Sequence, residues 1–180
     1  LFFFFAIKII PAQVRCGTMI LDSIRRANNP SLESPMAFEK WIKNKMADAT
    51  STANTIFNVP VIVHVIHEGE AIGTGRNISN SQINSQIPVL NADYRKLNAD
   101  TNKIPLAWKT TAADCEISFY LATTDIDGNP MTTPGIERIK RQDLNIGDAP
   151  PYSIDYFDQH IKPLTIWNPN KYLNIWISEI

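Results

Sequence analysis

The stretch Val59-Pro-Val-Ile-Val-His-Val-Ile-His67 decides the fold, because it is rich in β-branched residues and apolar on both faces. A segment of this kind is typical of a central strand that is buried on both sides of a sheet. Further β-rich segments predict three more strands, at 115–122, 135–140 and 171–178. A turn over 125–130 follows the second strand.

The clearest helix begins at Ser79, after a loop that contains three glycines. Ser79 and Gln82 match a capping box, and an apolar stripe with 4-3-4-3 spacing follows on one face: Ile83, Ile87, Leu90, Tyr94 and Leu97. Pro88 lies inside this helix, where it should remove a hydrogen bond and kink the axis at a cost of about 3 kcal/mol. The order strand, helix, strand, strand, strand predicts an α/β (α+β) layer in which helices pack on a mixed sheet.

Composition limits the class of protein. The chain has 180 residues, enough for one domain with a leader, and 44% hydrophobic against 19% charged residues exclude wholesale disorder. A net charge of -1 argues against a nucleic-acid partner. No apolar run reaches the roughly 18–20 residues that a membrane span needs, so no membrane association of the mature form is expected.

The first ten residues are apolar apart from Lys8, and Pro11-Ala-Gln13 follows them. We interpret residues 1–13 as a secretory signal peptide. Its basic start is expected to be missing, because the sequence does not begin with Met. The alternative is a buried strand of the mature domain.

Residues 14–58 are interpreted as a pro-segment and linker, and 59–180 as the main domain. Ser34 and Pro35 suit the N-cap and first position of a helix. Apolar residues then recur at helical spacing: Phe38, Trp41, Ile42 and Met46. Small polar residues over 47–54 predict a flexible join.

The histidines form no obvious metal site. His67-Glu68 begins an H-E-x-x-H pattern, but residue 71 is Ala. Residues three apart on a strand point to opposite faces, so His64 and His67 cannot grip one metal ion, and we interpret both as core or edge histidines. His160 is expected alone in a loop. The turn at Asp125 lacks the further acidic ligands of a calcium loop and is interpreted as an ordinary turn.

Several segments nevertheless resemble, in the same order, the pappalysin-type (cytophagalysin) zinc metalloproteases. They are residues 59–67, 70–79, 86–100, 113–122, 127–130 and 165–176. Arg15-Cys-Gly-Thr18 resembles the pro-segment motif of the same family. Each motif alone is weak, whereas the ordered set is specific.

This resemblance implies a metzincin-like upper subdomain, a twisted sheet backed by helices, that is incomplete at its C-terminus. It implies a secreted endopeptidase that hydrolyses protein or peptide substrates with one zinc ion, held by H-E-x-x-H-x-x-G-x-x-H, with the Glu as general base. That motif does not occur in residues 1–180, so the chain by itself is expected to be inactive, without catalytic or cofactor-binding residues. Pro88 departs from the helix formers usual in the family. A calcium requirement and the oligomeric state stay open.

Cys16 is the one candidate metal ligand, as a latency ligand to zinc in the zymogen. An inert thiol, or a disulfide with Cys115, remains an alternative. For the whole chain, the alternative function is a secreted, non-enzymatic binding or adhesion module. A lipoprotein anchored through Cys16 is a weaker one, because Arg15 suits that processing poorly.

Overall fold

The computed structural model describes residues 18–48 and 55–180 and divides the chain into two compact units, residues 1–51 and 52–180. The predicted signal peptide and Cys16 lie outside the described residues. None of the described helices is long and apolar enough to cross a membrane.

The first unit contains two helices, α1 (Thr18–Asn28) and α2 (Pro35–Asp48). The predicted start of α2 is confirmed, because the Ser34 hydroxyl accepts a hydrogen bond from the Ala37 N–H at 3.1 Å. The rings of Phe38 and Trp41 stack with their centroids 5.8 Å apart. Helix α1 was not predicted, since its sequence lacks a comparable start signal.

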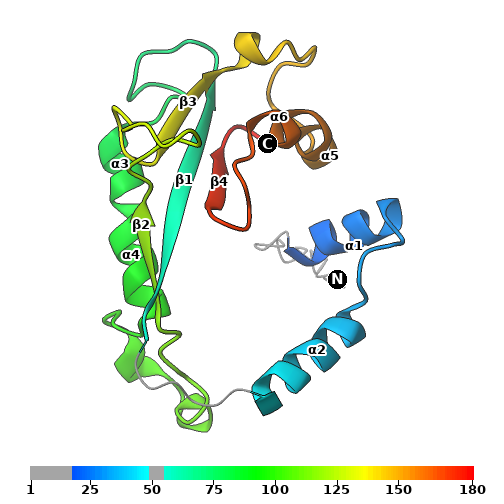
Figure 1. Cartoon of the computed structure of the whole chain (residues 1–180), viewed down its shortest axis with the longest axis vertical. Helices are drawn as coiled ribbons and strands as arrows, with labels where there is room; N and C mark the ends of the chain where they lie inside the picture. The colour runs from blue at the N-terminus through cyan, green and yellow to red at the C-terminus, as the bar shows by residue number, and fades with distance from the viewer. Residues whose placement is uncertain (1–17, 49–54) are drawn as a thin grey trace, which may run out of the picture. The chain divides into compact units, whose positions relative to one another are not determined.

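The second unit is built on a four-stranded sheet (Figure 1). Strand β1 (Phe57–His67) pairs with β2 (Ile117–Leu121) along its first half and with β3 (Ile136–Lys140) along its second half. Strand β4 (Leu173–Ile177) pairs with the middle of β1. All three pairings are parallel, so these strands form a parallel sheet where the sequence suggested a mixed one.

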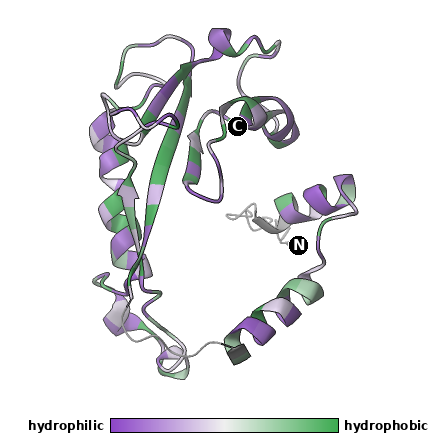
Figure 2. Ribbon diagram, viewed as in Figure 1, coloured by the Kyte–Doolittle hydropathy of each residue, from purple (hydrophilic) through white to green (hydrophobic). Residues whose placement is uncertain are grey.

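Strand β1 is central and buried on both faces, as predicted, and it is the most continuously hydrophobic element in Figure 2. No residue from Val61 to Ile66 is more than 3% exposed. On one face Val61, Val63 and Val65 pack with Ile83 and Phe119. The opposite face is covered by two clusters, one formed around Ile62 with Ala122 and Trp167, the other around Ile66 with Tyr152, Phe157 and Ile161.

The predicted long helix is present as two pieces, α3 (Asn80–Asn84) and α4 (Gln86–Tyr94), which are separated at Ser85. The Ser79 hydroxyl caps α3 by accepting from the Gln82 N–H at 3.2 Å. Pro88 has no N–H for the Asn84 carbonyl, so the helical hydrogen bond is missing directly before Ser85, three residues ahead of the proline.

The predicted apolar stripe holds for Ile83, Ile87 and Leu90, which pack on the core. The Tyr94 ring meets the Phe119 ring edge to face, with centroids 4.9 Å apart. Leu97 is a correction to the prediction: it is 74% exposed and follows the helix end, where Lys96 turns the chain with a φ of 53°.

Short helices complete the unit. They are η1 (Thr101–Lys103), η2 (Leu106–Trp108), η3 (Arg141–Leu144), α5 (Ile154–Tyr156), the π-helix η4 (Phe157–Ile161) and α6 (Lys162–Thr165). His160 therefore lies in a helical turn, with its ring 4.3 Å from that of Tyr156, and not in a loop as predicted.

Candidate functional site

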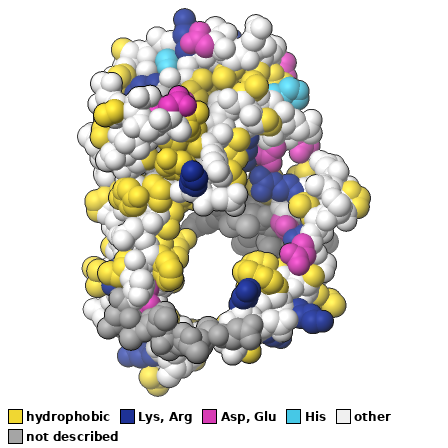
Figure 3. Space-filling model, in the orientation of Figure 1, with side chains coloured by type: hydrophobic (Ala, Val, Ile, Leu, Met, Phe, Trp, Pro, Cys, Tyr) yellow, Lys and Arg dark blue, Asp and Glu magenta, His cyan; other side chains and the backbone are white. Residues whose placement is uncertain are grey.

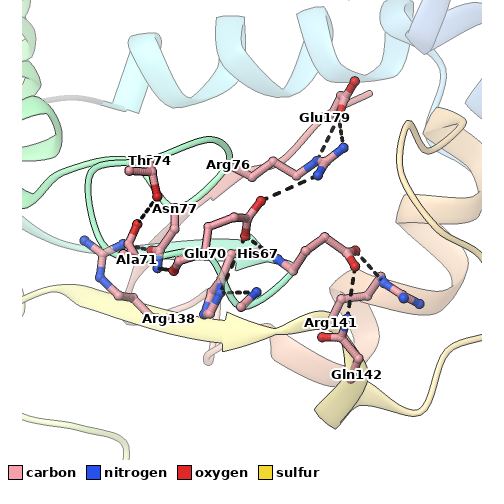
Figure 4. Close-up of polar contacts among 12 residues, drawn as sticks. His67, Glu70, Ala71, Thr74, Arg76, Asn77, Arg138, Arg141, Gln142 and Glu179 are labelled. Carbon is pink, nitrogen blue, oxygen red and sulfur yellow. Dashed lines mark hydrogen bonds and ion pairs between the residues drawn. The ribbon is translucent and has the colours of Figure 1, made fainter.

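The carboxyl ends of β1 and β3 lie together, which is where open parallel sheets commonly bind ligands. A polar cluster joins the loops that follow these strands to the chain after β4 (Figure 4). We call it the carboxyl-edge network; its members are His67, Glu68, Glu70, Arg76, Asn77, Arg138, Arg141, Gln142 and Glu179.

Glu68 ties the loop after β1 to helix η3. Its carboxylate accepts from Arg141 Nε at 2.6 Å and from Gln142 Nε2 at 3.0 Å. The hydrogen bond from Arg141 to this carboxylate raises the pKa of Arg141, against the opposing effect of burial. This ion pair joins the loop after β1 to η3.

Glu70 and Arg76 extend the network toward the end of β4. The Glu70 carboxylate accepts from the Glu68 N–H at 2.6 Å, and its other oxygen lies 3.5 Å from Arg76. Hydrogen bonds from backbone N–H groups, that of Glu70 itself first, lower the pKa of Glu70. Arg76 donates in turn to Glu179 at 2.8 Å, and this bond raises the pKa of Arg76.

Arg138, on β3, anchors the other side of the loop. Its guanidinium donates to the amide oxygens of Asn77 and, at 2.5 Å, of Asn80. Asn77 Nδ2 donates to the Glu70 carbonyl at 2.7 Å. Burial lowers the pKa of Arg138. These groups form hydrogen bonds and ion pairs with one another. The network therefore holds the 68–80 loop in place. None of its members is a nucleophile paired with a base.

A second polar cluster lies inside the sheet around His64, which is fully buried. His64 Nδ1 is 2.6 Å from Glu137 Oε2 on β3, and its Nε2 is 2.9 Å from Asn174 Oδ1 on β4. The interpretation of His64 as a core histidine is confirmed. The sequence did not predict Glu137 and Asn174 as its partners. Both lie on strands that pair with β1, and no local sequence pattern shows this pairing.

The described residues do not fit a zinc site. No group of three His, Cys, Asp or Glu side chains converges in the described ranges, 18–48 and 55–180. Both ring nitrogens of His64 have protein partners, and His67 Nδ1 accepts from the Gly69 N–H at 3.0 Å. The two histidines are three residues apart on one continuous strand, so they face opposite sides of the sheet.

The Asp125 segment is the turn that was predicted. The Asp125 carboxylate accepts from the backbone N–H groups of Asp127 at 3.0 Å and Asn129 at 2.8 Å. These bonds, the Asn129 bond first, lower the pKa of Asp125. Cys115 carries an exposed free thiol, while the proposed zinc ligand Cys16 lies outside the described residues.

An apolar groove of about 300 Å³ lies between α3–α4 and the sheet. Its floor includes Val63, Ile175 and Ile177, and its helix wall includes Ile83, Ile87 and Leu90. Figure 3 shows hydrophobic side chains reaching the surface of this unit. The groove is lined by side chains of the main core, and none of the lining side chains is ionisable.

No protein-family model and no curated protein matches the chain. Solved structures do. Mature mirolysin of Tannerella forsythia in complex with a cleaved peptide is 35% identical, with a TM-score of 0.54, over 71% of this chain and 43% of that chain. A promirolysin mutant of the same organism is 31% identical, with a TM-score of 0.60, over 87% of this chain and 47% of that one.

Mirolysin in complex with compound 9 is 34% identical, with a TM-score of 0.56, over 69% of this chain and 43% of that chain. The chain thus spans less than half the length of these structures. Mirolysin is a metzincin-type metalloprotease. The α/β sheet and its backing helices therefore have a metallopeptidase-like fold, similar to that of mirolysin.

Proposed function

We propose that these residues are the pro-segment and the front half of the catalytic domain of a secreted, pappalysin-type zinc endopeptidase. The observation that carries the proposal is the likeness to mirolysin in both its mature and its pro-form. The match to the pro-form covers 87% of the chain, against 71% for the mature enzyme. This larger share supports the assignment of the first unit to a pro-segment.

The proposed activity belongs to a longer parent protein, because the chain spans less than half of the related structures. The described residues do not fit a zinc site and the sequence contains no H-E-x-x-H motif, so the ligands of the catalytic zinc, apart from the latency ligand Cys16, are proposed to lie outside residues 1–180. Within the chain, the parallel sheet and the carboxyl-edge network hold the loops of the domain in fixed positions. Protein or peptide substrates are proposed, as the peptide complex of mirolysin suggests.

The test is made on the parent protein, produced from the complete coding frame. We expect it to hydrolyse a casein or peptide substrate, to lose this activity when zinc is removed with a chelator, and to regain it when zinc is returned. A parent protein without an H-E-x-x-H motif, or one that retains its activity without metal, would refute the proposal. In the first case the binding or adhesion module would become the better explanation.

Cys16 is proposed to keep that parent latent as a zinc ligand. A thiolate is a good ligand for zinc, and a coordinating thiol is deprotonated by the metal, so Cys16 would occupy the position that catalytic water needs. In the full-length zymogen, Cys16→Ala should give hydrolysis before any pro-segment cleavage, while Cys115→Ala, the matched control, should stay latent. A latent Cys16→Ala zymogen that becomes active after cleavage would remove Cys16 from the mechanism without affecting the proposed activity.

A further inference from the structure

The buried ring of His64 lies between two groups that accept hydrogen bonds. Glu137 Oε2 faces Nδ1 at 2.6 Å and Asn174 Oδ1 faces Nε2 at 2.9 Å. The ring is fully buried and also stacks on the Trp176 indole, with centroids 5.1 Å apart. The geometry therefore restricts where the protons of this ring can be.

The orientation of the Asn174 amide is fixed by backbone groups. Its oxygen accepts from the Trp167 N–H at 2.8 Å, and its NH₂ group donates to the carbonyls of Trp167 at 3.1 Å and Tyr172 at 3.2 Å. A flipped amide would set donor against donor and acceptor against acceptor. The oxygen therefore faces His64, and Nε2 of His64 must carry a hydrogen.

The second nitrogen faces a carboxylate. An ionised carboxylate can only accept, so Nδ1 must also carry a hydrogen unless Glu137 itself is protonated. The Glu137 side chain is 36% exposed, so water can solvate its charged form. An imidazolium between these acceptors gains a short charge-assisted bond to Glu137 and a favourable contact with the electron-rich face of Trp176.

We propose that His64 is a buried imidazolium whose two N–H groups join Glu137 on β3 to Asn174 on β4 across β1. We call His64, Glu137 and Asn174 the proton latch. Because Asn174 also holds the chain at Trp167 and Tyr172, the His64 ring links Glu137 on β3 to the turn that leads into β4. This device is independent of the proposed peptidase activity.

The other charges near the ring are consistent with one buried proton. From β3, Glu137 is the ionisable side chain in contact with the ring. Beyond Trp176, the Lys162 ammonium of the α6 segment lies 5.3 Å from the centre of the indole, and it is paired with Asp158. The residues that reach His64 from β4 and from the preceding turn, Asn174, Trp176 and Trp167, do not titrate.

The test is heteronuclear NMR of the histidine ring nitrogens in the full 180-residue chain at neutral pH. The chain has three histidines, so the His64 signals are assigned by elimination with His67→Gln and His160→Gln, which leave the latch intact. We expect both nitrogens of His64 to carry a proton that exchanges slowly with water. A His64 ring with a single protonated nitrogen would overturn the proposal.

The variant Glu137→Gln tests the contribution of Glu137 separately from that of Asn174. In Glu137→Gln the side-chain NH₂ can donate to Nδ1, so His64 should become neutral, with its proton on Nε2 alone. The indole N–H signal of Trp176 should shift with it. Glu116→Gln, a matched change next to β2, should leave both signals as in the parent chain. A His64 ring that stays doubly protonated in Glu137→Gln would show that Glu137 does not hold the proton.

Discussion

Among the glycines that the structure describes, Gly135, directly before β3, has the least room for a side chain. Its φ is +63°, and a Cβ placed on it would lie 2.6 Å from Leu121 Cβ and 2.9 Å from the Leu121 backbone. Gly135→Ala should therefore combine backbone strain with overpacking and lower the free energy of unfolding by about 2–5 kcal/mol. The measurement is urea unfolding followed by tryptophan fluorescence.

Gly128 is the matched control for that change. Its φ is +88°, but a Cβ there would meet nothing within 4 Å. Gly128→Ala should cost only the backbone strain, about 1–2 kcal/mol. Equal losses in the two variants would show that contact with Leu121 contributes nothing at Gly135.

The ionisation of Glu70 should make the free energy of unfolding of the second unit depend on pH. Backbone N–H groups lower its pKa below the ordinary value of 4.5. A carboxyl whose pKa is lowered by folding contributes stability above its unfolded value and loses it as pH falls through the folded value. On acidification from neutral pH to below 4.5, the parent chain should lose more stability than Glu70→Gln, whose side chain does not titrate in this range.

The urea midpoint at neutral and at acidic pH measures this difference. Glu39→Gln, on the exposed face of α2, is the control and should follow the parent chain. If Glu70→Gln loses as much stability on acidification as the parent, the hydrogen bonds to this carboxylate do not favour its ionised form.

At the scale of elements, one side chain joins helix α4 to strand β2. Asn91 donates to the Phe119 carbonyl at 3.0 Å and accepts from the Phe119 N–H at 2.6 Å, as a neighbouring strand would. Asn91→Ala leaves both groups of a buried residue unpaired and should cost about 2–4 kcal/mol. Asn84→Ala, on the exposed side of α3, should change stability by no more than about 0.5 kcal/mol. Urea unfolding compares them, and equal losses would refute the bridging role.

The strands and the caps could be predicted because their signals are local. The apolar run of β1 needs burial on both faces, and Ser34 and Ser79 accept from N–H groups three residues away. Pro88 correctly indicated a disturbed helix. It could not show that the break falls at Ser85, since the place depends on how both pieces pack.

The polar clusters could not be predicted, because their members are far apart in sequence. Glu68 and Arg141 are 73 residues apart, and His64 and Asn174 are 110 apart. Which charges meet is decided by strand pairing, which brings Glu137 opposite His64. Parallel pairing itself depends on crossovers that no short pattern encodes, which is why the sheet was expected to be mixed.

At the scale of the whole molecule, the fold and the proposed chemistry are separable in this chain. The sheet, its two covered faces and the carboxyl-edge network are present, and the fold is similar to that of mirolysin. Metal chemistry requires more, since a zinc site needs at least three ligands that converge on one point. A metalloprotease-like fold therefore predicts that a parent protein depends on a metal ion. It does not predict that every part of that protein binds one.

The 180-residue chain by itself should not bind zinc tightly. After dialysis against zinc and then against zinc-free buffer, it should retain much less than one equivalent of metal and show no peptidase activity. The reason is that His64 is enclosed by Glu137 and Asn174, while His67 is on the opposite face of β1 and bonds to Gly69. Metal analysis of the dialysed protein gives the answer. One retained equivalent that is lost in His64→Gln or His67→Gln would contradict the prediction and place a zinc site on β1.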